Sequence, residues 1–442
     1  MADWRKMREE RESALSRYAK KSAQSLGRVE PEPQCPMRTD FERDHHRILY
    51  SVDFRRLRHK TQVFFNTRND HICTRMEHVL YVGSISSTIA RTLGLNQDLA
   101  YAIALGHDLG HAPFGHTGER ALDECVKRID PSIGFEHETH SLRVVDRLAS
   151  RRPGLGSGER GDGVGEDAAA GLRADAAAGV GVDAAADSRA DAASGFRADA
   201  AAGVGEGPVA RDKGRASSRG LNLTFEVRDG IVCHCGEEYK EFSVRPDFQK
   251  APGRLAEADI RRQMPATLEG CVVRLVDKIA YVGRDIEDAL RAGVIDFHDF
   301  SRDALSELGF TNGQIINTLV SDLVDNSYER GEIKLSEGKG EALERLIMEN
   351  VRLIYRGGRI EGYEKTMRAT MEGLFGGLYS AYESRGEEGM RAADERVLRM
   401  FASYLGGQGY MEGESLAQRT LDFVAGMTDA FALQCYEELY WL

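Results

Sequence analysis

The chain has 442 residues and a formal net charge of −12 at pH 7, with 41% hydrophobic and 29% charged residues. This composition is typical of a globular protein with a sizeable core and excludes a chain that is disordered throughout. The acidic balance argues against a general nucleic-acid coat, because such proteins need clustered lysine and arginine. A small polyanionic substrate stays possible, since its site requires only a few basic side chains.

The cellular compartment is suggested by the cysteines and by the N-terminus. The seven cysteines are odd in number and dispersed, which favours free thiols in a reducing environment. The charged N-terminus has no signal-peptide core, and no apolar run reaches the ~18 residues of a membrane span. We therefore predict a cytoplasmic protein without a membrane segment.

Helical periodicity dominates the chain before residue 150. Apolar residues recur at three- and four-residue steps over 78–93, and a Gly/Asn break precedes a second helix that starts near Asp98. The same pattern predicts helices over 119–129 and 138–149. Between Arg38 and Lys60 basic residues outnumber acidic ones, and we interpret this stretch as a substrate or subunit contact rather than a DNA-binding patch.

Residues 151–220 differ from their surroundings. Ala and Gly supply 34 of these 70 positions, and an eight-residue repeat extends from Asp167 to Glu206. Each repeat offers about one residue larger than alanine, so burial cannot offset the entropy lost on ordering. We predict a disordered or weakly helical insertion in a surface loop; stacked short repeats are the alternative.

Helical periodicity returns after the insertion, over 220–234 and over 265–293. Further amphipathic stretches follow, and no convincing run of alternating strands appears. The predicted fold class is all-α, with any sheet limited to small hairpins. Cys233-His234-Cys235 invites a zinc interpretation, but one Cys-x-Cys without a second pair is weak evidence.

Titratable side chains are concentrated in one short segment. His107 and His111 stand four apart and are expected to share a helix face, with Asp108 beside the first. A proline and two glycines then end that helix and bring His116 and Glu119 close to it. Imidazole together with carboxylate suits a first-row divalent cation.

A metal centre needs donors from other segments, because His107 and Asp108 cannot supply a full ligand set. His78 begins one apolar stripe, and Asp277 lies inside another, where a carboxylate is costly unless it is paired or ligated. The sequence therefore predicts a centre assembled from three distant parts of the chain.

These residues, in this order, resemble the HD-domain metal phosphohydrolases. The motifs are RMEH at 75–78, HDLGHAPFGHTGE at 107–119 and DKIAYVGRD at 277–285. More closely, the chain resembles the deoxynucleoside triphosphate triphosphohydrolases, the branch that includes bacterial dGTPase. Shorter blocks extend the likeness over most of the chain outside the insertion: 41–48, 54–64, 135–137, 221–232 and 425–432.

The resemblance implies an HD-domain helical bundle with additional C-terminal helices. Residues 1–150 would form the N-terminal segment and the first part of the HD domain, with the insertion at 151–220. Residues 221–310 would complete the HD domain, and 311–442 would form the C-terminal helical region.

The resemblance also implies the reaction and the cofactor. The expected activity is hydrolysis of dGTP, or of deoxynucleoside triphosphates generally, to deoxynucleoside and tripolyphosphate. The implied ligands of one divalent ion are His78, His107, Asp108 and Asp277. Mg²⁺ or Mn²⁺ is expected first, although Fe²⁺, Co²⁺ and Ni²⁺ also suit this donor set.

Other roles follow from the family motifs. His116 would give a proton to the leaving 5′ oxygen, and His111, Glu119 and His137 would position it, the water or the α-phosphate. Phosphate contacts are implied for Arg75 and Lys278, and sugar contacts for Gln62, Tyr281 and Asp285. A tyrosine ring packed under the 2′ carbon would leave no room for a hydroxyl, which favours deoxyribose.

Two departures and two alternatives remain. Ala112 and Thr117 replace the Pro and Ala common in the bacterial branch, and Glu138 and His140 follow His137 where Asn and Gln are usual.

The first alternative function is an HD-type phosphohydrolase for another nucleotide or phosphomonoester. The second is a non-catalytic nucleotide-sensing or nucleic-acid-binding regulator. The family also implies homo-oligomers, with a nucleotide activator as a further possibility.

Overall fold

The computed structural model describes residues 3–63, 72–150, 220–235, 240–300, 302–355, 358–408, 410 and 413–440. The predicted insertion at 151–220 lies outside the described residues except for Gly220. Within them the fold is all-α, as predicted. Two-residue strands β1 (Ser243–Val244) and β2 (Ile333–Lys334) pair antiparallel across a long stretch of sequence. The helices are α1 (Trp4–Glu12), α2 (Asp40–Tyr50), α3 (Val52–Arg56), α4 (Arg75–Thr92), α5 (Gln97–Gly106), α6 (Gly115–Ile129), α7 (His137–Arg143), α9 (Phe225–Val232), α10 (Leu268–Arg291), α11 (Arg302–Leu308), α12 (Asn312–Ser327), α13 (Glu337–Asn350), α14 (Gly358–Arg391), α15 (Arg396–Gln408), α16 (Leu416–Ala425) and α17 (Asp429–Tyr440).

Helix starts are encoded locally by capping residues. The Asn96 side chain accepts hydrogen bonds from the amides of Asp98 and Leu99 at the start of α5, and Thr267 accepts from Gly270 in α10. These bonds satisfy amide donors that have no partner inside the helix. The caps therefore fix where the two helices that flank the candidate site begin.

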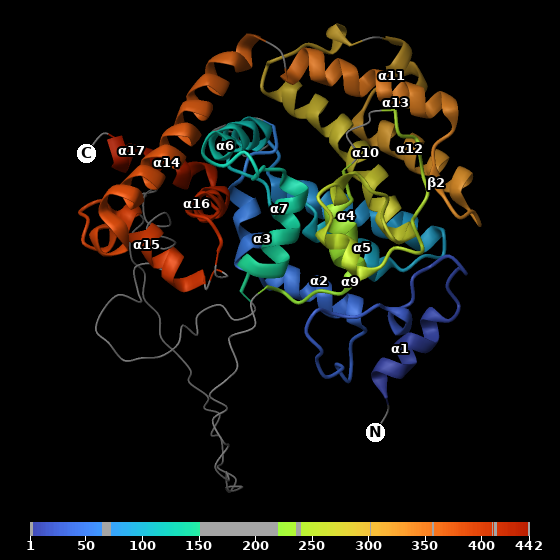
Figure 1. Ribbon diagram of the computed structural model, residues 1–442. Coiled ribbons are helices and arrows are strands. Elements are labelled where there is room, and N and C mark those ends of the chain that lie inside the picture. The colour runs from blue at the N-terminus through green and yellow to red at the C-terminus, as the bar shows by residue number, and fades with distance from the viewer. Residues whose placement is uncertain are drawn as a thin grey trace, which may run out of the picture. The chain divides into compact units, whose positions relative to one another are not determined.

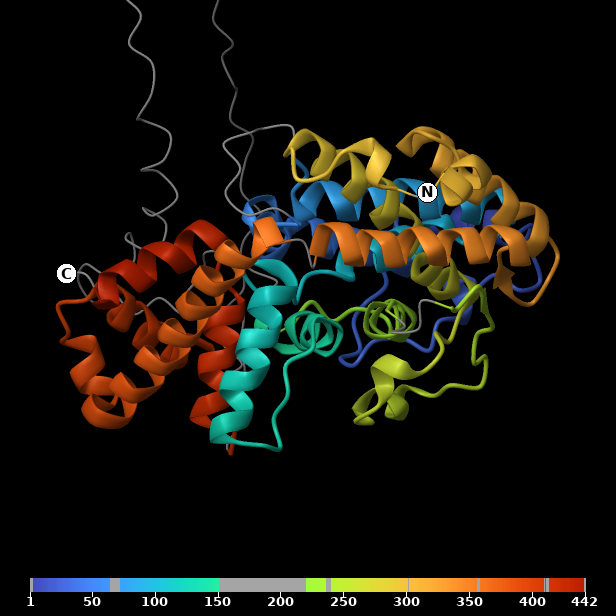
Figure 2. The same cartoon turned by 90° about the horizontal axis from the view of Figure 1, so that it is seen from above.

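Two hydrophobic clusters hold the helices together. In the first, α4, α5 and α10 pack against one another, with α2, α9, α12 and α13 around them (Figure 1). In the second, α14 packs against α6, α15, α16 and α17, and Figure 2 shows α6 beside α14 and α16 from a second direction. The segment from α5 to α6 passes from the first cluster to the second. The domain boundaries given above stay a prediction.

One local expectation is wrong. Helix α5 ends at Gly106, so His107 and Asp108 lie in the turn that follows, and His107 and His111 do not share a helix face. The turn presses against α7: a Cβ atom on Gly110 would stand 2.1 Å from the backbone nitrogen of Ser141. Only glycine fits there, and this close tertiary contact replaces the continued helix.

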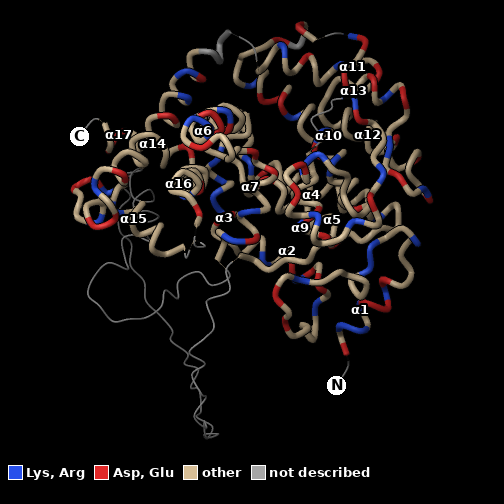
Figure 3. Tube along the Cα trace, viewed as in Figure 1, with Lys and Arg blue, Asp and Glu red and all other residues tan. Residues whose placement is uncertain are grey.

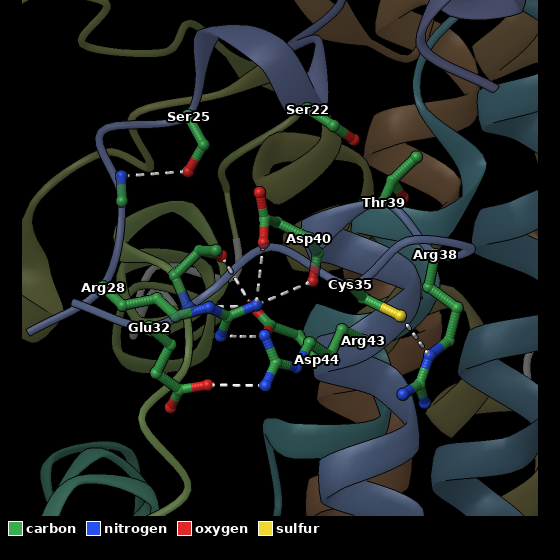
Figure 4. Close-up of polar contacts among 12 residues, drawn as sticks. Ser22, Ser25, Arg28, Glu32, Cys35, Arg38, Thr39, Asp40, Arg43 and Asp44 are labelled. Atoms are coloured by element: carbon green, nitrogen blue, oxygen red, sulfur yellow. Dashed lines mark hydrogen bonds and ion pairs between the residues drawn. The ribbon is translucent and has the colours of Figure 1, made fainter. Parts of the chain in front are cut away.

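A buried polar cluster joins the N-terminal segment to α2 and to the chain that follows residue 220. Arg28 lies between the carboxylates of Asp40 and Asp44 in Figure 4 and also donates to the carbonyl of Asn222 (2.6 Å). Asp44 in turn accepts from the amide and hydroxyl of Thr224, at 2.8 and 2.7 Å. Two nearby N-terminal segments and the distant segment around Thr224 thus meet on one buried ion pair.

Candidate metal centre

The candidate site lies where three helices and one turn meet. His78 lies in the first turn of α4, and His107 and Asp108 lie in the turn after α5. Asp277 is carried by α10, which packs against both α4 and α5. The packing of these helices therefore brings the predicted ligands together from 200 residues of sequence.

The four predicted ligands lie within contact range. Nε2 of His78 is 2.9 Å from Oδ1 of Asp277, and Nε2 of His107 is 3.7 Å from the same oxygen. Nε2 of His107 is also 3.5 Å from Oδ1 of Asp108. His78, His107 and Asp108 form one group whose potential ligand atoms lie within 4.8 Å of one another, and Asp277 forms another with His107 and His234. The assignment of the four residues as ligands of one ion stays a prediction.

The environment of the His107 ring shows most directly whether a divalent cation fits the candidate site. Its ring is fully buried, and Nδ1 lies 2.6 Å from the carbonyl oxygen of Ala104. Because that oxygen can only accept, Nδ1 holds the proton and Nε2 keeps its lone pair. Nε2 has no hydrogen-bond partner among the described residues. A buried, unpartnered imidazole lone pair beside two carboxylates fits a divalent cation.

The two carboxylates are held ionised. Burial alone would raise the pKa of Asp108, but His107, His111 and Arg75 hold it well below the usual range. Nη1 of Arg75 is 2.7 Å from Oδ2 of Asp108, with both side chains buried. The pKa of Asp277 is likewise lowered against its burial, chiefly by His78 and His107. Both groups therefore offer anionic oxygen at neutral pH.

A second set of side chains lies beside this centre. Glu119 on α6 contacts Nδ1 of His137 at 3.0 Å and Nδ1 of His116 at 3.2 Å. The ring of His137 stacks on that of His111 at 3.9 Å, and Nε2 of His111 is 3.2 Å from Asp108. His116 is the exposed member of the set, at 49% of its side chain. It is therefore the histidine that a substrate can reach most directly.

The residues expected around the sugar lie along one face of α10 and next to it. Tyr281 and Asp285 follow Asp277 at four-residue steps, so the three share a face. Tyr281 stacks on Tyr355, and the Tyr355 hydroxyl donates to Asp285 (2.6 Å). Burial raises the pKa of Asp285 to about 8, so this carboxyl is protonated at neutral pH.

The other residues predicted to contact the substrate are Gln62, Arg75 and Lys278. A Cβ atom on Gly115 would lie 3.6 Å from both Arg75 and the Gln62 carbonyl, so both residues lie close to the start of α6. The Gln62 side-chain oxygen is buried without a hydrogen-bond partner among the described residues. Lys278 contacts Glu241 at 3.2 Å. Phosphate contact by Arg75 and Lys278 stays a prediction.

Comparison with known proteins identifies the family. The model of the HD domain matches residues 75–168. Over 426 residues the chain is 34% identical to a "Deoxyguanosinetriphosphate triphosphohydrolase-like protein" of Caldanaerobacter subterraneus subsp. tengcongensis, covering 96% of this chain and 92% of the relative. The chain belongs to this family. A relative of the same name from Desulfatibacillum aliphaticivorans is 33% identical over 97% of this chain and 95% of its own length.

Family membership accounts for the divalent cation and for the arrangement of the HD motif. It does not identify the metal, the copy number of the chain or an activating nucleotide, and these stay predictions, as does the cytoplasmic location. Among the described helices, none is both long and apolar enough to cross a bilayer. Basic and acidic residues are mixed over the described chain in Figure 3. Arg43 and Arg47 of the basic stretch both pair with Glu32.

Several side chains around the HD motif were not predicted from sequence. Lys60 donates to the carbonyls of His111 and Ala425, and Asp429 accepts from the amides of Thr61 and Phe114. Lys60 lies in the block 54–64 and Asp429 in the block 425–432. Both blocks resemble the family, so the resemblance could have identified these two residues. Ser141 accepts from the Gly110 amide and donates to the His107 carbonyl, at 2.8 and 2.7 Å. Together with Tyr355, these residues hold the HD turn and the face of α10 that carries Tyr281 and Asp285.

His234 is the most consequential omission. The weak Cys-His-Cys interpretation gave it no role at the HD motif, yet its ring lies 4.8 Å from that of His107, centroid to centroid. It forms one group with His107 and Asp277 whose potential ligand atoms all lie within 4.8 Å of one another.

Proposed function

We propose that this protein hydrolyses deoxynucleoside triphosphates, dGTP among them, to deoxynucleoside and tripolyphosphate with a divalent cation. The observation that carries the proposal is the convergence of His78, His107, Asp108 and Asp277, with a buried imidazole lone pair among two ionised carboxylates. The printed names of the relatives support the substrate class.

The chain's own residues supply the remaining chemistry. A divalent ion held by the four ligands would lower the pKa of a water molecule and offset phosphate charge. Arg75 adds a fixed positive charge next to Asp108. His116 is exposed enough to reach the leaving 5′ oxygen, and its contact with Glu119 orients the ring.

The preference for deoxyribose rests on Tyr281 and Asp285. Tyr281 is partly buried and is held by its stacking on Tyr355, so it offers a rigid wall to a sugar ring. The protonated carboxyl of Asp285 has one oxygen without a hydrogen-bond partner among the described residues. That oxygen is available to a sugar hydroxyl, while the wall excludes a 2′ substituent.

Replacement of His116 by glutamine is expected to lower kcat by about 10²–10⁴-fold, because proton transfer by a positioned side chain contributes that much. KM is expected to change little, since glutamine keeps the size and polarity of the side chain. Steady-state kinetics with dGTP and Mn²⁺ measures both constants. His59→Gln is a suitable control, because His59 is also exposed and lies in a separate short 3₁₀ helix. An unchanged kcat in His116→Gln would remove the proton-donor role.

The substrate class is tested by incubating the purified chain with each dNTP, each ribonucleotide and a phosphomonoester in Mg²⁺ or Mn²⁺. Separation of the products by chromatography is expected to give deoxynucleoside from the dNTPs and little nucleoside from the ribonucleotides. Release of phosphate from the monoester alone would favour a different phosphohydrolase. Binding of nucleotide without any product would favour the regulator.

A further inference from the structure

A cavity of about 190 Å³ lies between α3, α7, α15 and α16, whose places in the fold Figure 1 shows. Leu109, in the turn after α5, and the side chain of Lys60 also line it. Within the part of the chain that the structure describes, none of the predicted metal ligands or substrate contacts lines this cavity. It is therefore a site separate from the candidate metal centre.

Lys60 brings a buried positive charge to the cavity. Its side chain donates to the carbonyls of His111 and Ala425, and the residue is only 3% exposed. An ammonium group has three N–H donors, so one is left over. Among the described residues Lys60 forms no ion pair, and burial together with the nearby Arg56 lowers its pKa to about 7. The charge on Lys60 is therefore poorly compensated by the protein.

The carboxylates that line the cavity are already paired with other cations. Asp422 accepts two hydrogen bonds from the guanidinium of Arg143, at 2.8 and 2.7 Å. Asp53 contacts Arg56 at 3.1 Å. Lys60 is the lining cation that has no such carboxylate among the described residues. The groups around the cavity thus leave one positive charge to be neutralised.

His140 adds a second unsatisfied group to the lining. The residue is 5% exposed, and neither ring nitrogen has a hydrogen-bond partner among the described residues. Its Nε2 lies 3.6 Å from Oδ1 of Asp422, which is too far for a hydrogen bond. Burial lowers the pKa of His140 to about 3, so the ring is neutral and keeps one N–H donor. A buried donor without a partner calls for a ligand or a water molecule.

We propose that this cavity binds one inorganic phosphate ion through Lys60, Arg56 and His140. The ion would supply the negative charge that Lys60 lacks and would accept N–H donors from all three side chains. The cavity is smaller than the roughly 300–1,000 Å³ of pockets for drug-sized ligands, which favours a small ion over a nucleotide. Arg56 is 41% exposed, so an ion can enter from solvent beside it.

The alternative is a cavity that holds water alone. Water could satisfy His140, but it carries no charge to offset the buried ammonium of Lys60. Occupation by phosphate would also bear on the candidate metal centre, because Lys60 holds the carbonyl of His111 and Leu109 follows Asp108 directly. The proposal goes beyond the proposed function and does not rest on it.

The test is isothermal titration calorimetry of inorganic phosphate into the full chain, which is freed of metal and kept in EDTA without nucleotide. Chloride at matched ionic strength is the reference for general salt effects. We expect saturable binding of one ion per chain. Arg56→Gln and His140→Phe are each expected to weaken it by at least about tenfold, since a hydrogen bond to a charged group contributes that much.

Arg55→Gln is the matched control, because it makes the same change at the neighbouring position of α3, which is exposed and does not line the cavity. It is expected to bind phosphate like the unaltered protein, and circular dichroism establishes that each variant is folded. A loss in Arg56→Gln alone would keep the site and remove His140 from it. The absence of saturable binding in the unaltered protein would overturn the proposal in favour of water. Equal affinity in Arg56→Gln and Arg55→Gln would overturn it as well.

The measurement needs neither a divalent metal nor a nucleotide. Phosphate binding that depends on Arg56 in a chain that hydrolyses no dNTP would support this site and contradict the proposed function. A chain that hydrolyses dNTPs but shows no such binding would contradict this site alone.

Discussion

Replacement of Asp108 by asparagine is expected to lower dNTP turnover by at least about 10³-fold. The amide has no negative charge to offer a cation, and a bound ion contributes several kcal/mol to such reactions. Each ~1.4 kcal/mol corresponds to a tenfold change in rate. The substitution also removes the ionic partner of Arg75, whose side chain is only 4% exposed. Steady-state kinetics with dGTP and Mn²⁺ gives the loss.

The control for this variant is Asp325→Asn, which makes the same chemical change at an exposed position on α12. It is expected to retain full turnover. Circular dichroism and a thermal melt establish that Asp108→Asn is folded. A folded Asp108→Asn variant with normal turnover would rule out the proposed centre.

Replacement of Asp44 by alanine is expected to lower the free energy of unfolding by about 3–5 kcal/mol. Asp44 is fully buried and pairs with Arg28, whose side chain is 6% exposed, so the variant leaves a buried guanidinium without this partner. It also removes the acceptor of the Thr224 amide and hydroxyl. Urea unfolding at neutral pH, followed by circular dichroism, measures the change.

An exposed ion pair gives the comparison. Glu341 and Arg345 form an i, i+4 pair on α13 with about half of each side chain exposed, so Glu341→Ala is expected to change stability by about 0.5 kcal/mol or less. If Asp44→Ala lowered the free energy of unfolding by no more than Glu341→Ala does, the cluster around Arg28 would contribute little to stability.

Much of the fold follows from local signals in the sequence. Apolar residues at helical spacing predicted the region of α4, and a capping residue marks the start of α5. The four candidate ligands were found because each lies in a motif whose order along the chain is distinctive. The order of the motifs can be read from the sequence even when the contacts between helices are unknown.

The contacts between segments that are distant in sequence could not be predicted from the sequence alone. The end of α5 at Gly106 depends on the close approach of Gly110 to α7, which no local pattern encodes. His234 enters the site because α9 packs against α5 and α10, and no local sequence pattern encodes that packing. The Tyr355 hydroxyl likewise contacts Asp285, which lies 70 residues earlier in the sequence.

The central claim is tested most directly by hydrolysis of dGTP in water enriched in ¹⁸O, with Mn²⁺ present and the products analysed by mass spectrometry. Attack of water on the α-phosphorus is expected to place one ¹⁸O atom in tripolyphosphate and none in deoxyguanosine. Orthophosphate or pyrophosphate carrying the label, together with dGDP or dGMP, would contradict the account.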